Sequence, residues 1–274
     1  MEFLTIFLSS LLAAISPTGL VLDTVIENRI SSRLAKVEQL EVRIDNAPSY
    51  QIIQGKVEKV RLAGRGLYLT PELRINALEL ETDPISLDIQ GIRQGNLSQL
   101  RQSLRQPLQG GVRLELSQED LNQALQSPAI KARMQAVVTR LVSGFTNSPA
   151  EDYELINPRV DFLGNNKFRL QMELRRNNPD ESANSQLNLS VESQLAVSQG
   201  HKIELVEPTI TVNNTPVPGF LIQGFTAGLN NRLNLQELEQ AGILARVLQL
   251  EIDEEVMNLA AFVRLEPLPA NSLP

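Results

Sequence analysis

Apolar and polar residues alternate along most of the chain, which is the pattern of half-buried β-strands. The alternation is clear at Leu40 and Val42, and it returns after each short polar or proline-containing break. It predicts one β region over about residues 40–116 and a second over about residues 160–212, followed by a hairpin around residues 253–258. We therefore expect mainly antiparallel sheets joined by short turns.

Glycines coincide with changes in this alternation. After Gly64-Arg65-Gly66 the apolar positions move from even to odd numbers, and a similar change separates Ile75 from Leu78. A parity change at glycines within a strand is typical of a β-bulge. Repeated bulges predict strongly curved sheets, with strands of about 15 residues where five or six are usual.

Helical periodicity interrupts the β pattern in four places. Ser117 is a hydroxyl residue suited to an N-cap, and Glu119 and Asp120 would lie in the first turn of the helix that follows. Ser127-Pro128 predicts a second helix start, with proline in the first turn. The sequence thus predicts helices over 23–36, 117–125, 128–145 and 220–238.

The N-terminus carries an uncharged stretch from Phe3 to Leu22. About 20 apolar residues suffice to span a membrane, so residues 1–22 are predicted to be a signal-like or membrane-anchor segment. Glu2 precedes the stretch and the first cations follow it, which leaves the side of the membrane and any cleavage open. A buried N-terminal helix of a soluble fold is the alternative. Residues 269–274 are expected to be a disordered tail.

Several segments together resemble the LmeA-like phospholipid-binding family, which occurs in bacteria, cyanobacteria and plastids. They include Pro48 and Gly55, which resemble the proline and glycine of the family's xPxxxxxG motif but have six residues between them where the motif has five. The resemblance extends over most of the chain and is weakest at residues 145–200. The segments that carry it are GLVLDTVIENRISSRL, VEQLEVRIDNAPSYQIIQGKVEKVRLAGRGLYL, LRINALELETDPISLD, VRLELSQEDLNQAL and VPGFLIQGFTAGLNNRLNL.

The resemblance implies an α+β fold in which long, strongly curved antiparallel sheets are wrapped with helices around an apolar cavity, similar to tubular lipid-binding folds. Residues 23–268 would form a single domain of this kind. It further implies non-enzymatic binding or transfer of phospholipid or another acyl lipid at a membrane, in the cell envelope, the periplasm or the thylakoid. The family has no established catalytic residues.

Composition narrows the chemistry further. The chain has 25 Lys and Arg against 32 Asp and Glu, a net charge of -7, and 4% aromatic residues, so a nucleic-acid surface is not expected. It has no Cys and a single His, His201, in a predicted turn, which argues against a metal centre. A lipid hydrolase with a Ser–His–Asp triad would need His201 as its base, and no GxSxG motif is present. We expect no cofactor and no catalytic residue.

The aliphatic strand and helix faces are the candidate ligand-binding surface, since mobile aliphatic side chains suit acyl chains. A packed core is the alternative for the same residues, and a scaffold that docks proteins on its sheet is the alternative function. Lys59, Arg61 and Arg65 share one strand face and are candidates for an anionic headgroup, or are simply solvated. The predicted cavity-lining residues are Val60, Leu62, Ile75, Leu80, Met134, Val138, Phe168, Leu170, Phe220 and Phe225.

Overall fold

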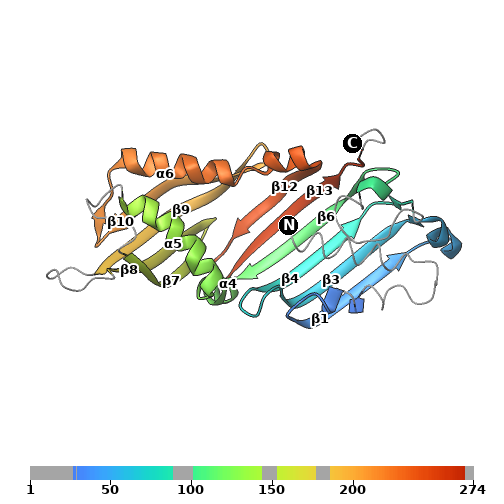
Figure 1. The fold of residues 1–274 in the computed structure, drawn as a ribbon, viewed down its shortest axis with the longest axis horizontal. Coiled ribbons are helices and arrows are strands. Elements are labelled where there is room, and N and C mark those ends of the chain that lie inside the picture. Colours follow the sequence, from blue (N-terminus) through green and yellow to red (C-terminus); the bar gives the residue numbers. More distant parts are fainter. Residues whose placement is uncertain (1–26, 29, 89–100, 144–152, 177–185, 269–274) are drawn as a thin grey trace. The chain divides into compact units, whose positions relative to one another are not determined.

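The computed structural model confirms the α+β class, because antiparallel sheets dominate and a few helices accompany them (Figure 1). The structure describes residues 27–28, 30–88, 101–143, 153–176 and 186–268. The predicted N-terminal segment 1–22 and the tail 269–274 lie outside the described residues. The predicted helix over 23–36 lies partly outside them and is helical only as far as Ser31.

The chain forms two compact units, and neither is a continuous stretch of sequence. The first comprises Met1–Glu115, Leu235–Gln249 and Leu259–Pro274, and the second comprises Leu116–Asn234 and Leu250–Asn258. The chain therefore passes from one unit to the other four times. That residues 23–268 fold as one cooperative domain stays a prediction.

The first unit contains most of a six-stranded sheet whose strand order is β1-β3-β4-β6-β13-β12. Its apolar residues face each other in rows across the strands, as Leu62 pairs with Leu80 and Leu80 with Val112. The bounds are β1 Lys36–Asp45, β3 Lys59–Tyr68, β4 Arg74–Thr82, β6 Leu108–Ser117, β12 Ile243–Ile252 and β13 Val256–Leu265, with a small β2 Lys56–Val57 and β5 Ile85–Ser86 sheet and the 3-10 helices η1 Ser49–Gln54 and η4 Leu235–Ala241.

The predicted bulge at Gly64-Arg65-Gly66 is not an inserted residue. Arg65 pairs with Ala77 and Leu67 with Ile75, so β3 and β4 stay in step through this point. Gly66 instead adopts a left-handed backbone with φ of 56°. The buried positions change parity on both strands together, which keeps Leu67 and Ile75 in the interior.

The second unit contains a five-stranded sheet in the order β11-β10-β9-β8-β7. Helices α5 and α6 pack on it through a core that includes Val138, Leu174 and Ile210, and α4 packs on a second cluster with Val160 and Phe162. The bounds are β7 Tyr153–Gly164, β8 Lys167–Arg176, β9 Gln186–Ser198, β10 Lys202–Val212, β11 Thr215–Pro216, α4 Gln118–Leu125, α5 Pro128–Ser143 and α6 Gly219–Arg232.

Both predicted helix starts are confirmed. The Ser117 hydroxyl accepts a hydrogen bond from the backbone N–H of Asp120 at 3.0 Å. The Ser127 hydroxyl accepts one from the N–H of Ile130 at 3.3 Å, and α5 begins at Pro128. The predicted 220–238 helix is divided into α6 and η4. The closing hairpin is confirmed, with Asp253 in its turn.

Side-chain amides of α4 cover the free edge of β7. Asn122 both donates to the carbonyl of Val160 and accepts from its N–H, each at 2.8 Å. Gln118 accepts from the N–H of Phe162, and Gln126, directly after α4, donates to the carbonyl of Pro158. A four-residue step along a helix advances about 6 Å and a two-residue step along a strand about 6.8 Å, so the two series stay nearly aligned.

The expectation of strongly curved sheets is wrong. In the part of the chain that the structure describes, no sheet is closed or strongly curled. The strands reach 13 residues at most, in β9, rather than about 15. Register shifts occur in the second unit, between Val206 and Thr209, between Ile156 and Arg159 and between Phe162 and Gly164, rather than at the glycines of β3. These three shifts lie on two strand pairs, β9–β10 and β7–β8, and such isolated bulges bend a sheet less than bulges repeated on every strand.

Candidate functional site

An apolar hollow of about 430 Å³ lies on one face of the six-stranded sheet, within the first unit. This volume falls in the range of about 300–1,000 Å³ that is typical of small-molecule sites. Polar side chains contribute only Thr82 and Gln109 to its wall. The remaining lining residues are Leu69, Ile75, Leu78, Leu80, Leu108, Gly110, Gly111, Val112, Leu114, Leu238, Ile243, Ala245, Leu259, Val263 and Leu265.

The hollow follows the length of β4. Ile75 lines it near one end of the strand and Thr82 lines it at the other. At about 3.4 Å per residue, the seven steps between them span roughly 24 Å. One leaflet of a bilayer has a hydrocarbon depth of about 15 Å, which is half of the core thickness. The hollow is therefore long enough for one acyl chain lying along the strand.

The opposite face of the same strands is charged. Lys59 contacts Glu81 at 2.5 Å, and Arg61 contacts Glu81 and Asp45, both at 3.0 Å. The hydrogen bonds from Lys59 and then from Arg61 lower the pKa of the Glu81 carboxyl. Arg65 is exposed beside a polar depression on this face. Since neighbouring residues alternate between faces, the three predicted headgroup cations point away from the hollow, and two of them are neutralised by carboxylates.

The predicted cavity-lining residues do not gather in one place. Ile75 and Leu80 line the hollow, whereas Val60 and Leu62 are 0% and 2% exposed and belong to the packed interior of the same unit. The other six belong to the second unit.

In the second unit, Met134, Val138 and Leu170 belong to, or pack against, the core beneath α5 and α6. Phe168 packs against the cluster beneath α4. Phe220 is 72% exposed at the start of α6, and so it lines no interior space. Phe225 lies within α6. The packed-core alternative therefore describes most of the buried members of this group.

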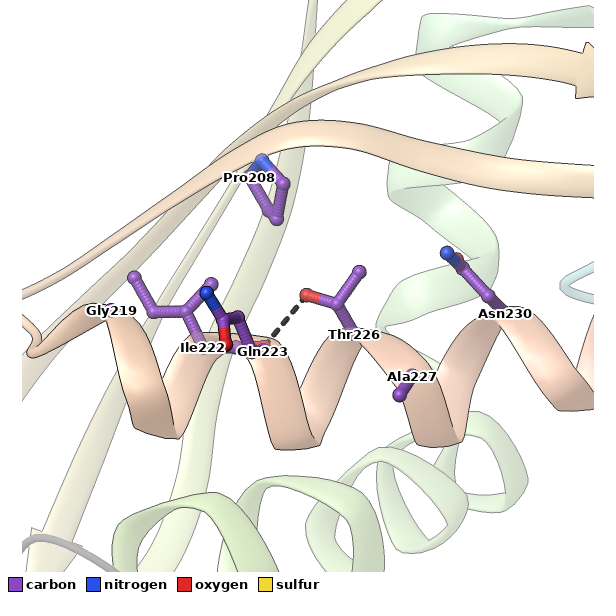
Figure 2. Close-up of a pocket in the computed structure, with 7 residues that line it drawn as sticks. All are labelled: Pro208, Gly219, Ile222, Gln223, Thr226, Ala227 and Asn230. Atoms are coloured by element: carbon purple, nitrogen blue, oxygen red, sulfur yellow. Dashed lines mark hydrogen bonds between the residues drawn. The ribbon is translucent and has the colours of Figure 1, made fainter.

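A second hollow, of about 470 Å³, lies between α6 and β10. Figure 2 shows Pro208 of β10 facing the helix, with Ile222 and Thr226 on the helix surface toward it. The Thr226 hydroxyl donates to the backbone carbonyl of Ile222 at 2.8 Å, and the side-chain amide oxygen of Asn230 accepts from the N–H of Leu205 at 3.0 Å. These bonds satisfy the helix and the strand edge, and the amide groups make this groove more polar than the hollow on β4.

Sequence reasoning missed several residues of the hollow. Leu78, Val112 and Leu114 lie on the strands that were predicted, and their parity with Leu80 was visible in the alternation. Ile243 and Val263 come from strands more than 160 residues after β4 in the sequence, and no local signal connects them to β4. Only the order of the strands in the sheet brings these residues together.

Comparison of the sequence with models of known protein families identifies the family of this chain. The model of the LmeA-like phospholipid-binding family matches residues 13–262. The chain belongs to the LmeA-like phospholipid-binding family. No curated protein and no solved structure matches the chain. The family match thus extends over both compact units of this LmeA-like protein.

Two further observations concern the chemistry of this LmeA-like protein. His201 lies in the turn between β9 and β10, where its Nδ1 atom is 3.0 Å from the carbonyl of Gln199. No carboxylate contact to this ring is found among the described residues. The helices within the described ranges are all too short or too polar to cross a membrane.

Proposed function

We propose that this chain is a non-enzymatic, membrane-associated protein that binds, and passes between membranes, a phospholipid or another acyl lipid. The apolar hollow along β4 is the observation that carries the proposal, because its wall is aliphatic over the length of an acyl chain. The family's phospholipid-binding description supports it. The uncharged stretch from Phe3 to Leu22 supports association with a membrane, in the cell envelope or the thylakoid.

The driving force for binding is burial of the acyl chain. Each buried CH₂ contributes about 0.8 kcal/mol, so a 16-carbon chain gains about 12 kcal/mol. Association and ordering cost about 4–15 kcal/mol, so binding of one chain is favourable when this cost stays below about 12 kcal/mol. Apart from Thr82 and Gln109, the wall offers no polar side chains that would select one particular acyl chain.

The test places one negative charge on either face of β4. Leu80→Asp puts a carboxylate against acyl carbon, which costs several kcal/mol unless the group is protonated. Ala77→Asp is the matched control, because Ala77 is on the same strand but lines the polar depression instead. We expect lipid that copurifies with the protein, measured by native mass spectrometry, to be lost in Leu80→Asp and retained in Ala77→Asp, with both variants folded by circular dichroism.

A second variant covers the case in which Leu80→Asp unfolds. Val263→Trp fills the hollow without adding charge, since Val263 is half-buried on its wall. Loss of lipid in a folded Val263→Trp variant supports the proposal. Equal lipid content in wild type and a folded Val263→Trp variant contradicts it. Protein that never carries lipid, yet binds other proteins through this sheet, would favour the scaffold function instead.

A further inference from the structure

Arg101 is held by two backbone carbonyls that lie within two residues of the hollow's lining residues Ile243 and Leu265. Its Nε atom donates to the carbonyl of Glu266 at 2.9 Å, and its Nη1 atom donates to that of Ala241 at 2.8 Å. Glu266 directly follows Leu265, and Ala241 lies two residues before Ile243. Because Leu265 and Ile243 both line the hollow, the guanidinium is fixed beside its wall.

No carboxylate neutralises this guanidinium within the described part of the chain. The Glu266 carboxylate, which is the nearest in sequence to one of the two carbonyls, is held by Arg264 at 2.7 Å. The Glu239 carboxylate is held by Arg246 at 2.9 Å. Arg101 is thus a half-buried cation with no carboxylate in contact among the described residues, whereas Lys59 and Arg61 both pair with Glu81.

The third nitrogen of the group stays available. Nη2 of Arg101 donates no hydrogen bond to the residues that the structure describes. Gly242 lies against it in a left-handed conformation with φ of 74°, and a Cβ atom there would come within 2.2 Å of Nη2. The glycine thus leaves room for the guanidinium, while the two carbonyls fix the plane of the fork.

We infer that Arg101 binds the phosphate group of the lipid whose acyl chain occupies the hollow. This inference rests on the proposed function. A planar guanidinium with free N–H groups on Nη1 and Nη2 matches two phosphate oxygens. Partial burial reduces screening by salt relative to an exposed cation. A fixed charge beside an apolar hollow orients the lipid, since the headgroup and the acyl chain then have separate sites.

The test compares two lipids with identical acyl chains, phosphatidylglycerol and diacylglycerol, on the full-length protein. Arg101→Gln removes the charge, and Arg101→Lys keeps it without the fork. Arg105→Gln is the matched control, because Arg105 is exposed and pairs with Asp88 at 3.7 Å. We expect Arg101→Gln to weaken phosphatidylglycerol binding about tenfold or more, with diacylglycerol binding unchanged. Arg101→Lys should lie between, and Arg105→Gln should match wild type.

Each other outcome overturns the inference in a distinguishable way. Unchanged phosphatidylglycerol binding in Arg101→Gln shows that Arg101 does not meet the phosphate, while the proposed function stands. An equal loss of both lipids shows that Arg101 only supports the wall. If inorganic phosphate binds the wild-type protein as tightly as phosphatidylglycerol does, then Arg101 is a site for free phosphate. Wild type that binds neither lipid refutes the proposed function itself.

Discussion

Asn122 gives the sharpest test of how the second sheet protects its edge. Its side-chain amide makes two hydrogen bonds to the backbone of Val160, a residue that is 8% exposed. Asn122→Ala leaves one N–H and one C=O of β7 without protein partners. A buried group without a partner costs about 1–3 kcal/mol. The two groups together therefore cost about 2–6 kcal/mol, and alanine regains about 0.5 kcal/mol of helix propensity, so we expect a loss of about 1.5–5.5 kcal/mol in the free energy of unfolding.

Urea denaturation followed by circular dichroism measures this loss, with the slope of the transition checked for constancy. Asn122→Asp keeps the acceptor for the Val160 N–H but cannot donate to its carbonyl, so it should lie between wild type and Asn122→Ala. Gln123→Ala is the control, because Gln123 is exposed on the same helix, and a change within 0.5 kcal/mol is about what such a surface site gives. If Asn122→Ala changes the free energy of unfolding no more than Gln123→Ala does, then water, and not the side-chain amides, satisfies the backbone hydrogen-bonding groups at the edge of β7.

Three further outcomes follow from the structure. Gly242→Ala should destabilise the protein by at least about 1 kcal/mol, because φ of Gly242 is positive and the Arg101 side chain fills the space that a Cβ atom would need. Gly224→Ala, whose Cβ atom would meet open space on α6, should stabilise the protein by up to about 1 kcal/mol. Equal denaturation midpoints for the two variants would contradict this prediction. Hydrogen bonds from the N–H groups of Val256 and Glu255 lower the pKa of the Asp253 carboxyl, so a pKa measured by NMR titration should lie below the ordinary value of about 3.9. The stability that the ionised carboxylate contributes to the folded protein should be present above about pH 3.9 and be lost as the pH falls through the lowered pKa. Proteolysis within residues 146–152 should not release two stable halves, since the second unit has residues on both sides; two folded fragments in size-exclusion chromatography would refute it.

The sequence predicted elements better than it predicted their arrangement. The Ser117 cap, the Ser127-Pro128 start and the Asp253 hairpin depend on neighbouring residues, and all three were visible in the alternation and the cap residues. The curvature of the sheets was wrong because a parity change has two physical causes. An inserted residue shifts the register of one strand, whereas here the buried positions of both β3 and β4 change parity near Gly66, which has a left-handed backbone, and the register stays intact. Only the pairing of neighbouring strands distinguishes the two, and alternation along one strand does not contain it.

The side-chain amides at the edge of β7 illustrate a second limit of prediction from the sequence. Gln118, Asn122 and Gln126 form a four-residue polar series that reads as an ordinary solvated helix face. Their role depends on β7 lying beside α4 with matching backbone spacing. Arg101 likewise gave no signal, because its partners are carbonyls 140 and 165 residues away. Backbone groups are the same in every residue, so a side chain that binds them leaves no complementary residue type to find in the sequence.

The distinction between the packed core and the hollow shows why the residues of the site were harder to predict from the sequence than the edge amides. Leu62 and Leu80 are direct neighbours on paired strands, face the same side and are chemically identical. Yet Leu62 is 2% exposed, whereas Leu80 is half-buried and lines the hollow. What separates them is the presence or absence of packed atoms opposite each side chain, and periodicity records only which face a residue occupies. A carboxylate at Leu62 must therefore displace packed neighbours and unfold the sheet, whereas one at Leu80 meets space that acyl carbon would fill. Of these two positions, lipid loss with a surviving fold is thus expected at Leu80 alone, and unfolding at both, together with equal lipid content in a folded Val263→Trp variant, would show that the hollow is part of the core.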